Sequence, residues 1–230
     1  PEEVTPLLQR IYKEPIKKQL VKKVIEEIKK ENIPVCVSST PQNASKLSKI
    51  AKDAGADIFC LQITVLTKNY NSKRHTSLNL EKFVKDIGIP VMMGNCVTYE
   101  VAKDLMEIGA SAILVGVGPG AACTTRGVLG IGVPQVTATM NCAKARDDFY
   151  KETKKYVSII TDGGMTCGAD ICKAFASGAD FVMFGNAFAK SKESPGKGYH
   201  WGMAMPHEYL PRGTRIHVGI SGSLEEILYG

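Results

Sequence analysis

A glycine-rich stretch that carries a cysteine offers the clearest chemistry in the sequence. Residues 116–126 read Gly-Val-Gly-Pro-Gly-Ala-Ala-Cys-Thr-Thr-Arg and follow the apolar run 112–116, which is typical of a buried strand. Because glycine and proline interrupt regular structure, the chain should bend directly after that strand. A thiol at Cys123, held on such a loop at the rim of a scaffold, could act as a nucleophile. The alternative role for a cysteine beside glycines is that of a small buried hydrophobe.

The spacing of these glycines argues against a dinucleotide-binding fingerprint. The pattern is Gly-x-Gly-x-Gly rather than Gly-x-Gly-x-x-Gly, and the next strand-like stretch offers no acid at the distance expected for a ribose contact. We therefore interpret the loop as a holder for the thiol.

Two later loops could bind a phosphate ester. Asp162, Gly163 and Gly164 end one apolar run, and Gly185 and Asn186 end the next. A carboxylate can accept hydrogen bonds from two vicinal ribose hydroxyls, and glycines let a ligand approach backbone N–H groups. Together the two loops resemble the phosphate cradle that follows the last two strands of a barrel. The alternative is that both are simply tight turns between a strand and a helix.

Further residues could lie beside these loops, at the end of the barrel where the strands finish, which we call the mouth. Asn95 ends a third apolar run, where it could contact a ligand or cap the following helix. Residues 195–211 are rich in glycine and proline, and they predict a mobile loop over the mouth that carries His200, Trp201 and Met203. The four histidines of the sequence show no metal-binding spacing.

The composition is that of an ordinary globular domain. The chain has 230 residues, of which 44% are apolar and 23% charged, and this argues against disorder. No run is long enough to span a membrane, and the first residues lack the pattern of a signal peptide. Much of the net charge of +6 lies in residues 13–30 between glutamates. This pattern favours a solvated helix face over a nucleic-acid surface, and a mild positive balance also suits a phosphate-bearing ligand.

Cysteine usage indicates a reducing compartment. The seven cysteines are an odd number, are scattered, and include no Cys-x-x-Cys pair. We therefore expect a cytoplasmic protein without structural zinc or a disulfide framework.

The elements that would position these residues alternate along the chain. Strands are predicted over residues 33–37, 57–62, 89–93, 112–117, 156–160 and 181–184. Helices are predicted over residues 16–31, a segment ending near residue 54, and residues 80–86, 98–108, 138–151 and 168–177.

Three of these helices end in the same way. Gly55, Gly109 and Gly178 each stand between a helix and an apolar strand, where they suit a left-handed helix stop. A repeated helix, glycine turn and buried strand is the βα unit of a parallel sheet covered by helices. Because several strands end in glycine loops on their carboxyl side, we predict an α/β fold, a TIM (β/α)8 barrel. A doubly wound open sheet is the alternative.

The predicted barrel is incomplete. About six of the eight βα units of such a barrel can be found in the sequence. We therefore expect residues 1–230 to form a single, partial catalytic barrel domain, with the first two strands missing from this sequence.

Taken together, these motifs resemble the IMP dehydrogenase/GMP reductase family. Residues 118–126, 132–135 and 162–164, followed by Gly185, match that family's cysteine loop, ribose site and phosphate site in order and spacing. The resemblance covers nearly the whole chain and is closest to the IMP-dehydrogenase-related paralogues. The segments shared with those paralogues are residues 14–16, 95–101, 195–203 and 211–215.

The resemblance implies a covalent mechanism. Cys123 would attack C2 of the purine of a nucleoside monophosphate (IMP, GMP or XMP), and Thr125 would assist proton transfer. Hydride would pass between C2 and NAD or NADP. The implied substrate-binding residues are Asn95, Gly120, Ala121, Asp162, Gly163, Gly164, Gly185, Asn186, Gly202 and Met203. The implied cofactor-binding residues are Gln62, Thr64, Gly116 and Gly118, and the implied potassium ligands are the carbonyls of Gly118, Gly120 and Cys123.

Departures from the family pattern bear on the direction of the reaction. Gln62 stands where dehydrogenases carry an aspartate, Ala121 stands where a serine is common, and the Arg-Tyr flap that activates water has no counterpart. Without that flap, hydrolysis of an adduct to XMP should be slow, so we favour reduction of GMP to IMP and ammonia. Glu208 is the nearest candidate for the glutamate that assists deamination in reductases.

Several alternatives stay open. IMP dehydrogenation is the first of them, and an FMN-dependent barrel oxidoreductase and a non-catalytic purine-nucleotide sensor are the others. Relatives assemble as tetramers or octamers, so the resemblance also implies a homo-oligomer.

Overall fold

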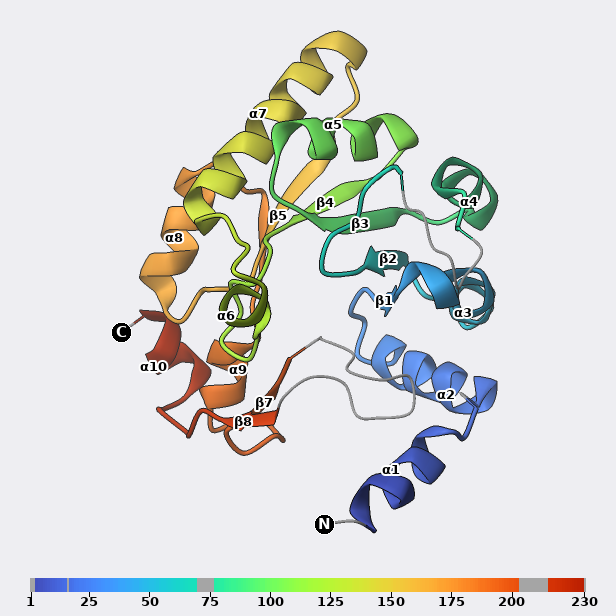
Figure 1. Ribbon diagram of the computed structural model, residues 1–230, viewed down its shortest axis with the longest axis vertical. Coiled ribbons are helices and arrows are strands. Elements are labelled where there is room, and N and C mark those ends of the chain that lie inside the picture. The colour runs from blue at the N-terminus through green and yellow to red at the C-terminus, as the bar shows by residue number, and fades with distance from the viewer. Residues whose placement is uncertain (1–2, 16, 70–76, 203–214, 230) are drawn as a thin grey trace.

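The computed structural model describes residues 3–15, 17–69, 77–202 and 215–229. Its centre is a six-stranded sheet of parallel strands in the order β1-β2-β3-β4-β5-β6, curled as part of a TIM barrel (Figure 1). Sequential neighbours therefore pair throughout, whereas a doubly wound sheet reverses its strand order, so the alternative fold is excluded. The strands are β1 (Cys36–Ser39), β2 (Ile58–Gln62), β3 (Val91–Cys96), β4 (Ala112–Val115), β5 (Ser158–Asp162) and β6 (Phe181–Met183).

Helices of the βα units pack on the outer face of this sheet. The ones that follow strands in the described ranges are α3 (Pro41–Asp53), α4 (Leu80–Ile87), α5 (Tyr99–Ile108), α6 (Thr125–Leu129), α7 (Gln135–Thr153), α8 (Gly168–Ala176) and α9 (Asn186–Lys190). Helices α1 (Val4–Tyr12) and α2 (Lys18–Lys29) precede the sheet, and α10 (Leu224–Tyr229) follows it. No helix of the described segments combines the length and the apolar character that crossing a bilayer would require.

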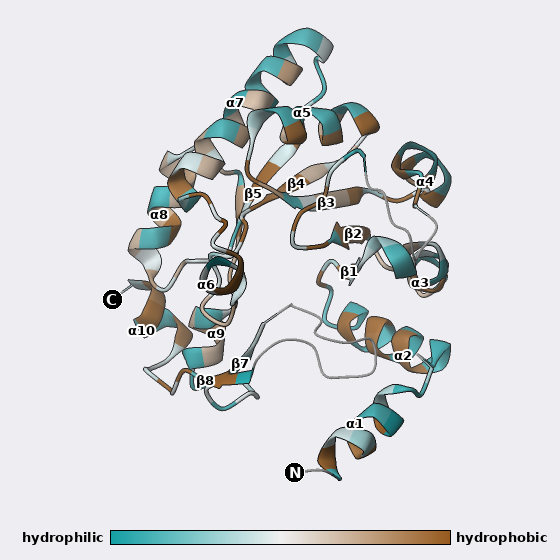
Figure 2. Cartoon of the chain, in the orientation of Figure 1, coloured by the Kyte–Doolittle hydropathy of each residue, from teal (hydrophilic) through white to brown (hydrophobic). Residues whose placement is uncertain are grey.

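Strand alternation divides the buried side chains between two faces. Phe59, Leu61 and Ile113 are fully buried on the face covered by the helices. Cys60 and Leu114 belong to a separate buried cluster on the inner face of the curled sheet. Hydrophobic residues on both faces are typical of a parallel sheet. Figure 2 shows brown, hydrophobic segments along strands such as β2 and β3.

The glycine stops of the predicted βα units are confirmed. Gly55, Gly109 and Gly178 have φ angles of +88°, +105° and +98°. A residue without a β-carbon adopts this left-handed conformation at little cost, so each helix can end and turn directly into the next strand.

The position of β1 corrects the predicted strand over residues 33–37. The strand begins at Cys36 because Pro34 has no N–H group to donate, and because the N–H of Val35 donates instead to the carboxylate of Asp57 at 2.7 Å. Lys29 also contacts this carboxylate, at 2.7 Å. The remaining predicted strands and helices are confirmed, with shifts of one to three residues at their ends.

The predicted loop over residues 195–211 is partly wrong. Its residues 199–201 form β7 (Tyr199–Trp201), which pairs antiparallel with β8 (Arg215–His217) in a separate two-stranded sheet. The guanidinium carbon of Arg215 lies 3.7 Å from the ring centroid of Tyr199, which stabilises the pair.

Candidate functional site

The loop that carries Cys123 is closed by a single arginine. The Nε atom of Arg126 donates to the carbonyl of Val117 at 3.1 Å, and its Nη2 atom donates to the carbonyl of Val133 at 2.7 Å. Within the loop, the N–H of Cys123 donates to the carbonyl of Gly120 at 3.0 Å. These bonds hold the glycine-rich stretch as a compact turn at the carboxyl end of β4.

The thiol lies at the rim of the sheet and not in its core. Cys123 is partly exposed, and its sulfur donates to the hydroxyl oxygen of Thr125 at 3.2 Å. Thr125 is the first residue of α6, so the pair is set by the short helix that follows the turn. A hydroxyl at this position can relay the proton of the thiol to a further acceptor if the sulfur acts as a nucleophile.

The cysteine loop packs directly against the loop that follows β5. A β-carbon built on Gly163 would lie 3.1 Å from Cγ of Pro119 and 3.3 Å from the backbone nitrogen of Gly120. One built on Gly164 would lie 3.2 Å from Cβ of Pro119. Both glycines have φ angles above +80°, so the close approach and the left-handed backbone each favour glycine. The structure therefore brings together two motifs that lie about 40 residues apart in the sequence.

A network of polar side chains surrounds Asp162 at the end of β5. The Nδ2 group of Asn95 donates to its Oδ2 atom at 2.8 Å, and the Nε2 group of Gln62 donates to the same atom at 3.1 Å. Burial raises the pKa of Asp162, and the two amide donors offset part of that rise. Within the described residues, no side chain or backbone group donates to the other carboxylate oxygen, Oδ1, which leaves it available to hydroxyl donors of a ligand.

Two buried polar atoms near the end of β6 have no hydrogen-bond partner among the described residues. One is Oδ1 of Asn186, the buried first residue of α9. The other is Nδ1 of His200 on β7, and a β-carbon built on Gly185 would lie 3.1 Å from Nε2 of the same ring. Burial lowers the pKa of His200. The sequence analysis placed His200 on a loop, although its place between Tyr199 and Trp201 is typical of strand alternation.

Gln135 links the ends of β4 and β5, a contact that the sequence by itself does not reveal. Its Nε2 group donates to the carbonyl of Val115 at 2.6 Å and to the carbonyl of Asp162 at 3.2 Å. Gly116 is buried beneath it, since a β-carbon there would lie 2.5 Å from the carbonyl oxygen of Asp162. Its segment, residues 132–135, resembles a family motif, but the sequence gives no indication of these two contacts.

An apolar pocket of about 240 Å³ lies behind the cysteine loop. It is lined by Val65, Cys96, Val97, Thr98, Val101, Val117, Ile131, Gly132 and Val133. The pocket therefore joins the end of β3 to the segments on either side of the cysteine.

The other predicted site residues differ in their placement. Thr64 and Ala121 are exposed, Gly118 is half-buried against Arg126, and Gly202 follows β7. Met203 and Glu208 lie outside the described residues. The described ranges contain no group of three or more His, Cys, Asp or Glu residues arranged to hold a metal ion.

Comparisons with known proteins show what the chain is similar to. Residues 12–215 match the IMP dehydrogenase / GMP reductase domain. An uncharacterized oxidoreductase of Mycolicibacterium smegmatis is 34% identical over 228 residues, covering 97% of this chain and 61% of that protein. An inosine-5'-monophosphate dehydrogenase of Cryptosporidium parvum is 40% identical over 159 residues, covering 67% of this chain and 36% of the enzyme.

A solved structure is similar along almost the whole chain. The crystal structure of an IMP dehydrogenase/GMP reductase-like protein from Corynebacterium glutamicum superposes with a TM-score of 0.84 at 34% sequence identity. The match covers 98% of this chain and 59% of that one. The chain thus spans about three-fifths of the length of the Mycolicibacterium and Corynebacterium proteins, and about one third of the Cryptosporidium enzyme.

Proposed function

The chain belongs to the IMP dehydrogenase/GMP reductase family, and from that premise we propose that it is an oxidoreductase acting at C2 of a purine nucleoside 5'-monophosphate. The activity would proceed through a covalent bond between C2 and the sulfur of Cys123. The observation that supports this most directly is the packing of the cysteine loop on the Asp-Gly-Gly loop, with Gly163 against Pro119 and Gly120. This packing brings the loops of Cys123 and Asp162 together at one end of the sheet, which supports their proposed roles as nucleophile and ribose ligand.

The ligand-binding roles follow from the loops themselves. The free Oδ1 atom of Asp162 would accept hydrogen bonds from the ribose hydroxyls, because a carboxylate is an acceptor with two oxygens. Backbone N–H groups of Gly164, Gly185 and Asn186 would hold the phosphate, and Gly202 and Met203 would contact the base. Ala121 is exposed and supplies no hydroxyl, so the phosphate would lack one side-chain donor there.

We propose reduction of GMP as the direction of the reaction. The sulfur of Cys123 would add to C2 while its proton is relayed through the hydroxyl of Thr125 to the exocyclic amine, which then leaves C2 as ammonia. A bound NADPH would supply the hydride that reduces C2. The carbon–sulfur bond then breaks, which returns the thiol and releases IMP. The glutamate proposed to assist loss of ammonia is Glu208.

One sequence departure supports this direction over oxidation of IMP. Oxidation needs an activated water to hydrolyse the adduct, and the segment between Met203 and Ile216 is too short for the flap that carries the Arg-Tyr pair in dehydrogenases. IMP dehydrogenation is the second candidate, because named IMP dehydrogenases are similar to this chain.

The described residues fit a nicotinamide dinucleotide only in part. The exposed hydroxyl of Thr64 is available at the end of β2, beside the apolar pocket that Val65 lines. The amide of Gln62 donates to Asn95 and Asp162, so its donors are already used within the protein. Gly116 is buried and packs against Gln135, while Gly118 is more accessible. Thr64 and Gly118 are therefore the residues that would contact NAD or NADP.

Three further proposals accompany this function. Potassium would be held by the carbonyls of Gly118, Gly120 and Cys123, of which that of Gly120 already accepts the N–H of Cys123. A homotetramer or octamer would cover exposed apolar side chains such as Val128, which is 75% exposed. A reducing, cytoplasmic compartment would keep all seven cysteines as the free thiols that the structure contains.

Turnover assays test the proposal directly. The chain is mixed with GMP and NADPH, and separately with IMP and NAD, and the absorbance of the reduced nicotinamide is followed. We expect loss of absorbance in the GMP mixture, its abolition in Cys123→Ala, and full rate in Cys172→Ala, which alters an exposed thiol on α8. A gain of absorbance in the IMP mixture alone would assign the dehydrogenase instead.

Other outcomes of these assays would indicate one of the two remaining alternatives, a nucleotide sensor or an FMN-dependent enzyme. Binding of nucleotide without turnover in either mixture would indicate a sensor, and a yellow preparation with bound flavin would indicate an FMN enzyme. Full turnover of Cys123→Ala would contradict the covalent mechanism.

A further inference from the structure

Three side chains from three strands meet at the mouth of the sheet. The Nε2 group of Gln62 on β2 lies 3.1 Å from Oδ2 of Asp162 and 3.3 Å from Oδ1 of Asn95. Asn95, near the end of β3, donates to the same Oδ2 atom at 2.8 Å. One carboxylate oxygen thus receives two neutral amide donors, and the amides are linked to each other.

We propose that Gln62 is a positioning residue for Asp162, and that it holds this carboxylate ionised and oriented for a ligand instead of contacting the dinucleotide. This inference rests on the proposed function, in which Asp162 accepts hydrogen bonds from the ribose hydroxyls. On this inference, the amide at position 62 serves Asp162, whereas the acid at that position in dehydrogenases contacts the dinucleotide.

The physical reason is the cost of burying a carboxylate without a cation. Burial disfavours the charged form, and donors to that form favour it. The described elements around Asp162 carry no charged side chain toward it: β3 and β6 present Asn95 and Met183, and Gly116, which follows β4, has no side chain. The ionised state therefore depends on the two amides.

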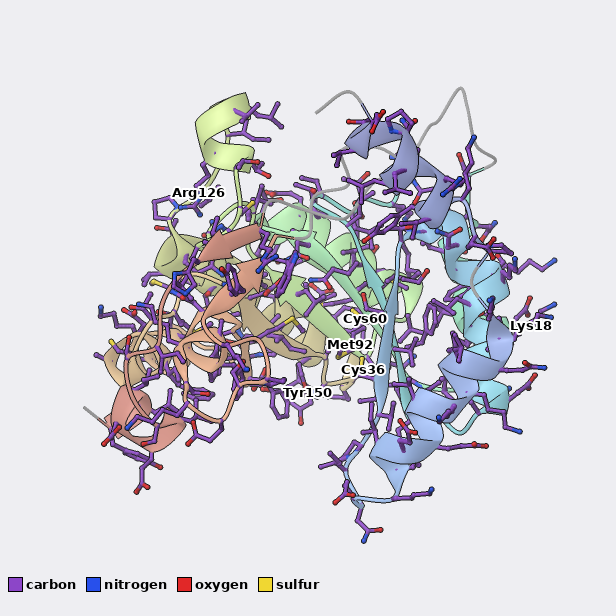
Figure 3. All side chains as sticks on the ribbon, turned by 90° about the horizontal axis from the view of Figure 1, so that it is seen from below. Lys18, Cys36, Cys60, Met92, Arg126 and Tyr150 are labelled. Atoms are coloured by element: carbon purple, nitrogen blue, oxygen red, sulfur yellow. The ribbon has the colours of Figure 1, made fainter. Side chains whose placement is uncertain are left out.

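The other titratable group facing Asp162 is a thiol that stays neutral. Cys60 lies two residues before Gln62 on the same face of β2. Its pKa is far above the ordinary value because Cys36 hydrogen-bonds to it and because it is buried. Figure 3 shows Cys36, Cys60 and Met92 close together within the sheet. The thiol therefore offers no charge that could substitute for the amide of Gln62.

A carboxylate at position 62 would have the opposite effect. Two carboxylates within hydrogen-bond distance share one proton, and one of the two apparent pKa values rises strongly. Glutamine has the shape of glutamate but supplies a donor in place of the second charge. The identity of residue 62 thus decides whether a single ionised acid stands at the mouth at neutral pH.

The experiment compares Gln62→Glu and Gln62→Met with the unaltered chain. The carboxyl carbon of Asp162 is titrated by NMR on protein labelled with carbon-13 aspartate, and its signal is assigned with Asp162→Asn. Affinity for IMP and for GMP is measured by calorimetry at each pH. The matched control is Gln9→Glu, which makes the same charge change on α1, a helix without buried residues.

We expect the pKa of Asp162 to rise in both variants, and to rise more in Gln62→Glu. Nucleotide affinity should then begin to fall at a higher pH than in the unaltered chain, by up to about tenfold for each pH unit below that pKa. Gln9→Glu should match the unaltered chain in both measurements. Gln62→Met keeps the test valid if Gln62→Glu does not fold, because it removes the donors without adding a charge.

An unchanged titration of Asp162 in the folded Gln62 variants would overturn the inference. The failure of the proposed function has a different signature. If the unaltered chain binds neither nucleotide while the titration shifts as expected, the positioning role is upheld and the assigned substrate is wrong.

Discussion

The side-chain amide of Gln135 lies 2.6 Å from the carbonyl oxygen of Val115, at the residue where β4 ends and the cysteine loop begins. The ladder between β4 and β5 ends with the pair of Val115 and Thr161. Beyond this last pair, Gln135 joins the two strands instead, because the same amide donates to the carbonyl of Asp162 at 3.2 Å. One side chain from α7 thus fixes the two strand ends that carry the proposed nucleophile and the proposed ribose ligand.

Replacing this amide should destabilise the protein. Gln135→Met keeps the length of the side chain but leaves two partly buried carbonyls without this donor, which typically costs about 1–3 kcal/mol. Urea denaturation should show that loss, whereas Gln9→Met on α1 should leave the midpoint within experimental error. An unaltered midpoint for Gln135→Met would show that water replaces the amide at no cost.

Gly116 should tolerate no side chain. A β-carbon there would lie 2.5 Å from the carbonyl oxygen of Asp162, on backbone with φ of +143°. Gly130 provides the matched control, since its φ is also positive, at +66°, and a β-carbon would meet nothing within 4 Å. We expect Gly116→Ala to lower the free energy of unfolding by about 1–3 kcal/mol more than Gly130→Ala, which is the cost of overpacking. Equal losses in the two variants would contradict the close packing of β4 on β5.

The hydroxyl of Thr125 should speed formation of the covalent adduct. Thr125→Val removes the hydroxyl oxygen that accepts a hydrogen bond from the Cys123 thiol at 3.2 Å. Loss of a proton-transfer group typically slows a reaction by about 10²–10⁴-fold. Rapid quenching and mass spectrometry of the nucleotide adduct would measure this rate. Thr124→Val is the control, because Thr124 is exposed and its side chain caps no helix. Equal rates in both variants would remove Thr125 from the mechanism.

The stability of the protein should respond to pH in opposite directions at two aspartates. The folded-state pKa of Asp162 is raised from 3.8, so its contribution to stability is present at low pH and is lost as pH rises through the raised value. The folded-state pKa of Asp170 is lowered from 3.8 to about 2 by bonds from Thr166 and Lys173, so its contribution is present above 3.8 and is lost as pH falls toward 2.

Denaturation of Asp162→Asn and Asp170→Asn across this range measures both effects. Relative to the unaltered chain, Asp162→Asn should gain stability as pH rises from 3.8. Asp170→Asn should be less stable at neutral pH, with a deficit that shrinks as pH falls below 3.8. Parallel pH profiles for Asp162→Asn and the unaltered chain would show that Asp162 titrates as an ordinary surface acid.

The amino-acid sequence by itself determined the repeating βα units and the position of the cysteine loop. These features are local: the left-handed stops at Gly55, Gly109 and Gly178 need only glycine, and the bend after β4 needs only glycine and proline. Apolar runs of strand length between helices then favour a parallel sheet. Such signals lie within a few residues of each other, so they can be identified along the chain.

Only the tertiary structure decided which polar side chains meet. Gln62 and Asp162 are separated by 100 residues, and the alignment of β2, β3 and β5 brings their polar atoms within hydrogen-bond distance. The same holds for Gln135, whose amide reaches two strand ends, and for His200, which strand pairing turns toward Gly185. Side-chain hydrogen bonds depend on distances of a few tenths of an ångström, and the packing of whole strands and helices sets those distances.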